Sequence, residues 1–136
     1  MPNGFHGPKE EWQRMEAPYV RIDPILVSFA QRHGFELVRN YRDADRSIRF
    51  NDSLSRAIWV HATDKYGTEG TYQVSVIAHQ DRDDRYLKAA RVADPVVNDD
   101  LDQILERATA IVASWSEKDL ELPLPPRERG ETERIY

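Results

Sequence analysis

One apolar stripe predicts that the segment 98–115 is an amphipathic helix. Apolar residues recur there at intervals of three and four, the period of an α-helix that buries one face. Asn98 stands where an N-cap belongs. The negative charges of the aspartates that follow it stabilise the helix, because they lie at the positive end of its dipole. The stripe consists of Leu101, Ile104, Leu105, Ala108, Ile111, Val112 and Trp115. Such a helix needs an apolar surface on which to pack.

Two shorter helices are predicted in the first 34 residues. One begins at Pro8 and ends before Pro18, because proline suits the first position of a helix and disfavours its interior. The other begins at Asp23 and ends at Gly34, where glycine fits the left-handed position that follows a helix. Together with the segment 98–115, these make three expected helices.

Between residues 35 and 92 the apolar period changes to two, which predicts half-buried β-strands. Short polar connections favour an antiparallel sheet, since parallel strands need longer crossovers. Matching the apolar faces pairs Ile58 with Ala78 and Val60 with Val76, and a shift by two residues matches them equally well. We therefore predict a single α+β domain over 1–122, in the order α-α-β-β-β-β-β-α. It has four to five antiparallel strands, with helices packed on one face.

The composition mainly excludes classes of function and of chemistry. The net charge of −5 argues against general nucleic-acid binding, which needs basic residues to neutralise phosphates. The absence of cysteine excludes disulfides and thiolate chemistry, and it suits a reducing compartment. No apolar run is long enough to span a bilayer. We expect a soluble, cytoplasmic protein without nucleic-acid or membrane partners, and a disordered C-terminal tail over 123–136, which is rich in proline and charge.

Candidate catalytic and metal-binding patterns are weak. The serines lie in no Gly-x-Ser-x-Gly motif. In the matched register, His61 and His79 are separated by roughly 13 Å, too far to share a metal ion. The acidic run 81–84 lacks the spacing of a calcium loop and is typical of a turn. We therefore expect no catalytic residue, no metal and no cofactor.

One group of side chains suggests binding, because the alternation places it on the sheet face opposite the helices. Tryptophan and arginine are enriched at binding hot spots, so this face predicts a non-catalytic interaction module, such as an adaptor, immunity protein or chaperone. Its partner is another protein or a second copy, bound through the sheet face or edge. The alternatives are an enzyme or small-ligand binder with a site near His61 and Arg49, or a face covered by the N-terminal segment. The expected binding residues are Arg49, Trp59, His61, Ser75, Ile77 and His79.

Three segments carry a resemblance to a known family. They are the opening Gly4-Phe5-His6-Gly7-Pro8-Lys9-Glu10-Glu11-Trp12, the helix end Arg32-His33-Gly34, and Ser114-Trp115-Ser116 followed by Asp119-Leu120-Glu121. In these the chain resembles a family of small uncharacterised α+β proteins, over most of its length up to Leu122. The resemblance implies no activity, and it implies that the opening segment belongs to the domain.

Overall fold

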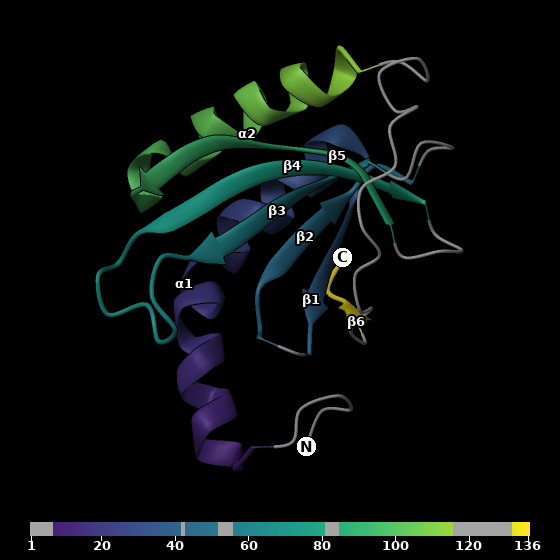
Figure 1. Cartoon of the computed structure of the whole chain (residues 1–136). Helices are drawn as coiled ribbons and strands as arrows, with labels where there is room; N and C mark the ends of the chain where they lie inside the picture. Colours follow the sequence, from purple (N-terminus) through teal and green to yellow (C-terminus); the bar gives the residue numbers. More distant parts are fainter. Residues whose placement is uncertain (1–6, 42, 52–55, 81–84, 116–131) are drawn as a thin grey trace.

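The computed structural model describes residues 7–41, 43–51, 56–80, 85–115 and 132–136, without the side chains of 79, 80 and 85–87. In this part of the chain, two helices and an antiparallel sheet of six strands follow in the order α-β-β-β-β-β-α-β (Figure 1). The predicted α+β class is confirmed, with six strands where four to five were expected. No described helix is both long and apolar enough to cross a membrane. The elements are α1 (Lys9–His33), β1 (Glu36–Asn40), β2 (Arg46–Arg49), β3 (Arg56–Ala62), β4 (Tyr72–Gln80), β5 (Arg85–Val96), α2 (Asn98–Ala113) and β6 (Thr132–Arg134).

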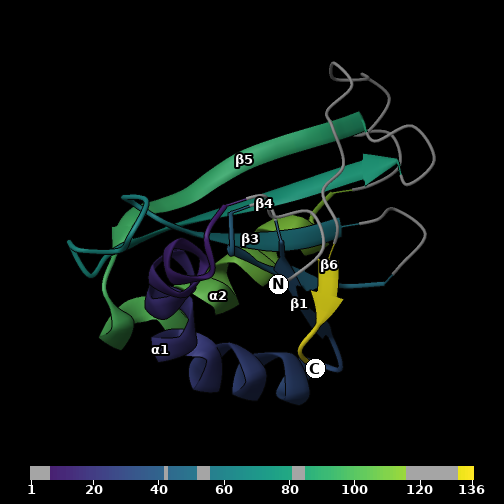
Figure 2. The ribbon, with the colours of Figure 1, turned by 90° about the horizontal axis from the view of Figure 1, so that it is seen from below.

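The prediction of two N-terminal helices is wrong, because α1 is one continuous helix that contains Pro18 and Pro24. Its buried side chains keep the helical period across both prolines, so packing on the sheet outweighs the two missing N–H donors. The Tyr72 hydroxyl donates to the Pro18 carbonyl and ties the helix to β4 at this point. The axis of α1 bends along its length, as expected of a helix with internal prolines (Figure 2).

The sheet has the order β5-β4-β3-β2-β1-β6, and all its neighbours are antiparallel. Ile58 pairs with Val76 and Val60 with Val74, so the preferred register was wrong by two residues. The reason lies in the β3–β4 connection, where the Asp64 carboxylate accepts the backbone N–H groups of the next turn and shortens the loop. The apolar faces match in both registers, and the turn chemistry decides between them.

Both helices cover the same face of the sheet, and the core lies between the two layers (Figure 2). α2 packs on β3, β4 and β5, whereas α1 packs on β1 and β2 and also touches α2. Trp115, at the end of the predicted stripe, is 7% exposed and belongs to the core. The N-cap of α2 is Val97, not the predicted Asn98, which forms the first turn. The amphipathic pattern therefore predicted the covering helix and its buried face correctly.

The sixth strand lies in the segment 123–136, which was expected to be disordered. Of that segment, residues 123–131 lie outside the described part of the chain, and Thr132–Arg134 form β6 on the outer edge of β1. Its three residues are exposed and show no apolar alternation. The strand is held by backbone hydrogen bonds to β1, and the pattern of apolar and polar residues along the chain does not predict such a pairing.

Gly67 is required where the β3–β4 connection meets α1. Gly67 and Gly70 both have left-handed φ angles, of 64° and 68°. A Cβ atom at Gly67 would lie 2.3 Å from Cβ of Pro18, whereas one at Gly70 would have nothing within 4 Å. Gly70→Ala is therefore a matched control for the close approach.

We expect Gly67→Ala to lower the free energy of unfolding by about 1–3 kcal/mol more than Gly70→Ala does. Both variants place alanine in a strained left-handed conformation, but only the methyl group at position 67 clashes with α1. Chemical denaturation of the two variants measures the difference. Equal losses would show that Pro18 yields to the added methyl group.

Candidate functional site

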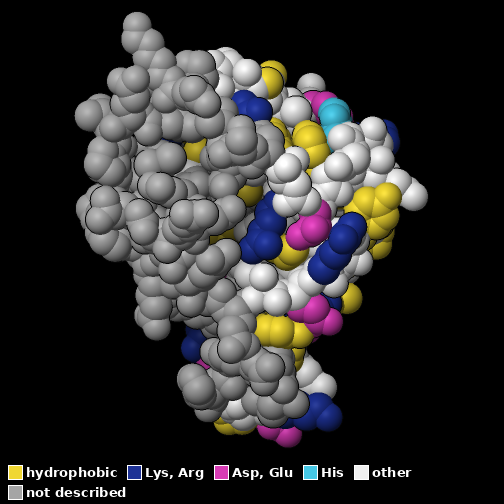
Figure 3. Space-filling model, turned by 90° about the vertical axis from the view of Figure 1, so that its right-hand side faces the viewer, with side chains coloured by type: hydrophobic (Ala, Val, Ile, Leu, Met, Phe, Trp, Pro, Cys, Tyr) yellow, Lys and Arg dark blue, Asp and Glu magenta, His cyan; other side chains and the backbone are white. Residues whose placement is uncertain are grey.

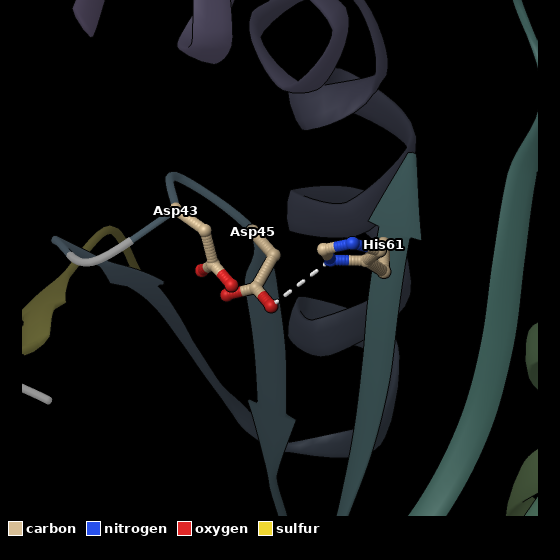
Figure 4. A group of neighbouring side chains, drawn as sticks. All are labelled: Asp43, Asp45 and His61. Atoms are coloured by element: carbon tan, nitrogen blue, oxygen red, sulfur yellow. Dashed lines mark hydrogen bonds and ion pairs between the residues drawn. The ribbon is translucent and has the colours of Figure 1, made fainter. Parts of the chain in front are cut away.

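Three side chains with metal-ligating groups meet at one corner of the sheet, beside the N-terminal half of α1. Asp43 and Asp45 come from the turn between β1 and β2, and His61 comes from the end of β3 (Figure 4). Their ligand atoms all lie within 4.8 Å of one another. In Figure 4 the two carboxyl groups face each other, and the imidazole points toward Asp45.

Asp45 is the centre of this cluster. It is 2% exposed, and its carboxylate accepts hydrogen bonds from Trp59 Nε1 and Asn40 Nδ2. His61 Nδ1 lies 3.3 Å from Asp45 Oδ2. A buried carboxylate needs such donors to offset its lost hydration. Asp45 therefore fixes the orientation of both ring side chains on β3.

A buried arginine holds the turn that carries the two aspartates. Arg46 is fully buried, and its Nη1 donates to the Ala44 carbonyl at 2.7 Å. Its Nε and Nη2 bind the two carboxylate oxygens of Asp23 on α1, at 2.9 and 3.0 Å. Ala44 has a φ of 66°, a left-handed conformation that is uncommon for a residue other than glycine. The Arg46 contacts favour this conformation, which puts Asp43 and Asp45 on the same side of the turn.

The two carboxyl groups influence each other's ionisation. Partial burial and then the negative charge of Asp45 raise the pKa of Asp43 to about 6. A hydrogen bond between the two carboxyl groups acts in the same direction, because it favours the protonated form of Asp43. The pair therefore binds a proton as the pH falls toward 6, and a cation placed between the carboxylates would compete for the same position.

A pocket of about 550 Å³ opens next to the cluster. Met15 and Tyr19 of α1 supply its apolar wall, and Asp43 and His61 supply polar groups. Burial raises the pKa of Tyr19, whose hydroxyl oxygen accepts the Ala62 N–H at 2.8 Å, so the phenol stays neutral. The lining residues are Gly7, Glu11, Met15, Tyr19, Asp43, His61, Ala62, Thr63, Asp64 and Lys65.

Several charged side chains that line the pocket already have partners of their own. The Lys65 ammonium lies 2.8 Å from a Glu11 carboxylate oxygen, and the Asp64 carboxylate accepts backbone N–H groups of its own loop. Asp43 faces the pocket directly, and Asp45 lies buried behind it. The pocket thus has the form of a small-molecule site, with an apolar wall and a few polar groups.

The structure brings only some of the predicted binding residues together. Trp59 and His61 lie on the face opposite the helices and both contact Asp45, with ring centroids 5.3 Å apart. Arg49 lies at the other end of the sheet, since it pairs with Ala57, four residues from His61, or roughly 13 Å along the strand.

Two further predicted residues are covered. Ser75 and Ile77 are on the same face as Trp59 but are each 8% exposed. The side chain of His79 lies outside the described part of the chain, and its backbone continues β4 away from His61. The binding residues expected from sequence are therefore not one accessible patch.

Sequence analysis missed the two aspartates, because they lie between two strands and belong to no recognisable metal-binding motif. A usable signal existed in the β2–β3 pairing. Ile48 pairs with Ile58 and Arg46 with Val60, so the next step along the hairpin brings Asp45 beside His61. Extending that apolar register by one residue from the strand end would have predicted the carboxylate–imidazole contact.

The chain was compared with protein-family models, with curated proteins and with solved structures. None of the three comparisons gave a match.

The raised pKa of Asp43 predicts a pH-dependent effect of Asp43→Asn on stability. The pKa of about 6 in the folded state exceeds the unfolded value of about 3.9. Wild-type stability is therefore lost as the pH rises through this range, because the folded state binds the proton more tightly than the unfolded state does. The amide does not titrate, so we expect Asp43→Asn to exceed wild type in free energy of unfolding by about 1 kcal/mol at pH 8, after allowance for solvent screening.

Denaturation curves at several pH values measure this difference in free energy of unfolding. It should become smaller as the pH falls, and it should no longer change below pH 4. Glu69→Gln, at an exposed position in the β3–β4 connection, serves as the control. A difference between Asp43→Asn and wild type that stays constant from pH 4 to pH 8 would contradict the coupling of the carboxyl pair.

Proposed function

We propose that this chain binds a divalent transition-metal ion at Asp43, Asp45 and His61, and through it a small ligand in the adjoining pocket. The observation that carries the proposal is the convergence of three donor groups within 4.8 Å at the wall of a pocket of about 550 Å³. The proposal takes up the small-ligand-binding alternative, with His61 but not Arg49 at the site.

The type of donor supports a transition metal. An imidazole nitrogen with two carboxylates suits zinc, iron or nickel, whereas magnesium and calcium prefer all-oxygen sites. Three protein ligands are the usual number at sites that keep a position open for water or a ligand. Asp43 and His61 both line the pocket, so an ion held by them would be reachable from it.

Electrostatics support the same proposal. The carboxyl pair is held together although burial and the negative charge of Asp45 raise the pKa of Asp43. A divalent cation replaces the shared proton and removes this repulsion. The contacts of Asp45 with Asn40 and Trp59 hold the carboxylate in place, as hydrogen bonds around metal ligands commonly do.

The pocket supports a small organic ligand as the second component. Met15 and Tyr19 offer an apolar surface on one side, and Thr63 offers a hydroxyl group at the rim. A ligand with one metal-binding oxygen or nitrogen and a compact apolar body matches this division.

Isothermal titration of the full chain with ZnCl₂ and with MgCl₂ tests the proposed site. We expect one zinc ion per chain at pH 7.5 and an affinity for magnesium lower by tenfold or more. Zinc affinity should fall as the pH is lowered through 6, because protons then compete for Asp43. Asp43→Asn and His61→Gln should each lower zinc affinity at least tenfold.

His33→Gln is the matched control, because His33 also has a carboxylate partner, Glu106 at 2.9 Å, and lies at the C-terminal end of α1, away from the pocket. It should bind zinc as wild type does. Folded wild-type protein that binds no zinc, or a His61→Gln variant with unchanged affinity, would overturn the proposed site.

The interaction role expected of the sheet face stays a prediction. Of its proposed residues, Trp59 and His61 are engaged by Asp45, and Ser75 and Ile77 are buried. A protein partner that protects Trp59 from a soluble quencher, with no dependence on metal, would favour that role over the metal site.

A further inference from the structure

The C-terminal strand β6 pairs with the end of β1 that leads into the site turn, residues 41–45, which carries the two aspartates. Asn40, the last residue of β1, lies opposite Thr132, the first residue of β6. In Figure 4 the faint yellow ribbon of β6 lies beside this hairpin. Beyond β6, the Ile135 N–H donates to the Leu37 carbonyl at 2.7 Å and extends the pairing along β1. The docked C-terminal residues thus support β1 up to the point where the site turn begins.

One side chain of β6 contacts the site turn directly. The hydroxyl of Tyr41, the first residue of the turn, donates a hydrogen bond to the Glu133 carboxylate. The ring of Tyr41 also packs on Trp12 of α1, with ring centroids 5.6 Å apart. Glu133 therefore ties the turn to the strand at the same residue that α1 contacts.

A chain of ion pairs forms a second connection between β6 and the site turn. Arg39 of β1 lies 3.3 Å from the Glu133 carboxylate and 2.9 Å from that of Glu16 on α1. Glu16 lies 3.2 Å from the buried Arg46, which binds the Ala44 carbonyl. On the right-hand side of Figure 1, where β6 lies, basic and acidic side chains are next to one another on the surface (Figure 3). Glu133 thus belongs to the charge network that fixes the turn.

Asn40 joins the strand pairing to the metal-binding cluster itself. Its backbone pairs with Thr132, and its side-chain amide donates to the Asp45 carboxylate. Its N–H donates to the Asp45 carbonyl at 3.0 Å, and its carbonyl accepts the Ala44 N–H at 2.9 Å. Asn40 is therefore held between β6 on one side and the site turn on the other.

The docking of β6 is weak enough to respond to changes at the site. All three of its residues are exposed, and surface ion pairs contribute about 0–1 kcal/mol each. Short, exposed elements of this kind open at a lower free energy than the whole fold. A moderate stabilisation of the site turn therefore changes how often β6 is released.

We propose that β6 is a clamp on the metal site: its docking orders the site turn, and ion binding at Asp43, Asp45 and His61 strengthens its docking. The coupling rests on the proposed function, because the bound ion is one of its two partners. By linkage, the factor by which docking raises ion affinity equals the factor by which the ion favours docking. The C-terminal strand thereby regulates how tightly the site holds its ion.

Zinc titration of full-length variants measures one direction of the coupling. Glu133→Ala removes the acceptor of Tyr41 and the partner of Arg39, so we expect its zinc affinity to be lower by roughly fivefold or more. Arg134→Ala is the matched control, because it also removes an ion pair of β6, but one with Glu36 at the other end of β1. Its zinc affinity should stay close to that of wild type.

Amide hydrogen exchange measures the other direction in the wild-type chain. Because the Ile135 N–H is bonded to the Leu37 carbonyl, its exchange reports release of the C-terminal residues from β1. Zinc should slow this exchange by the same factor, roughly fivefold or more. The Phe35 N–H, bonded to the Ala30 carbonyl at the end of α1, is the internal control and should respond less.

A third measurement separates the clamp from the metal. In the metal-free protein, Glu133→Ala should speed exchange at the Ala44 N–H, which is bonded to the Asn40 carbonyl. Unchanged Ala44 exchange in this variant would overturn the clamp whether or not zinc binds. Equal zinc affinities of Glu133→Ala and wild type, or Ile135 exchange that zinc leaves unchanged, would overturn the coupling alone. A wild-type chain that binds no zinc would overturn the metal site and the coupling with it.

Discussion

The buried guanidinium of Arg46 is the interaction on which the functional corner of this molecule depends. It joins the first residue of β2 to the middle of α1 through two hydrogen bonds to Asp23 and a further contact with Glu16 at 3.2 Å. Removing one partner from a buried ion pair costs about 3–5 kcal/mol, because the remaining charge stays without compensation. The same side chain binds the Ala44 carbonyl, so helix docking and turn conformation are fixed together.

The candidate site follows from that constraint. Arg46 fixes the Ala44 carbonyl, and the backbone of Ala44 is left-handed. Asp43 and Asp45, on either side of Ala44, are thereby held close together although their negative charges repel each other. The β2–β3 register then brings His61 to Asp45, and the bent N-terminal half of α1 forms the pocket wall beside them. The energy that holds two carboxyl groups side by side therefore comes from the packing of a helix on a sheet.

Sequence periodicity predicted what depends on one buried face: the apolar stripe of α2, the alternating strands and the burial of Trp115. It failed where local rules yield to tertiary packing, as at the prolines inside α1. It also failed where pairing partners are far apart in the chain, as for β6 on β1. Arg46 offered an unused signal, since it shares the parity of Ile48 and so falls on the buried face of β2. A charged residue at such a position needs a buried partner, and that requirement points to the acidic residues of α1.

The dependence of the site on Arg46 is tested most directly by the pKa of Asp43 in a variant that lacks the guanidinium. NMR titration of the side-chain carboxyl carbons would compare wild type with Arg46→Met, combined with Asp23→Asn to avoid an uncompensated buried charge. In wild type the pKa of Asp43 should lie at about 6. In the folded variant it should fall toward the ordinary value of about 3.9, because the freed turn exposes Asp43 to water and lets the two carboxyl groups separate. A folded variant in which the pKa of Asp43 stays near 6 would contradict the account.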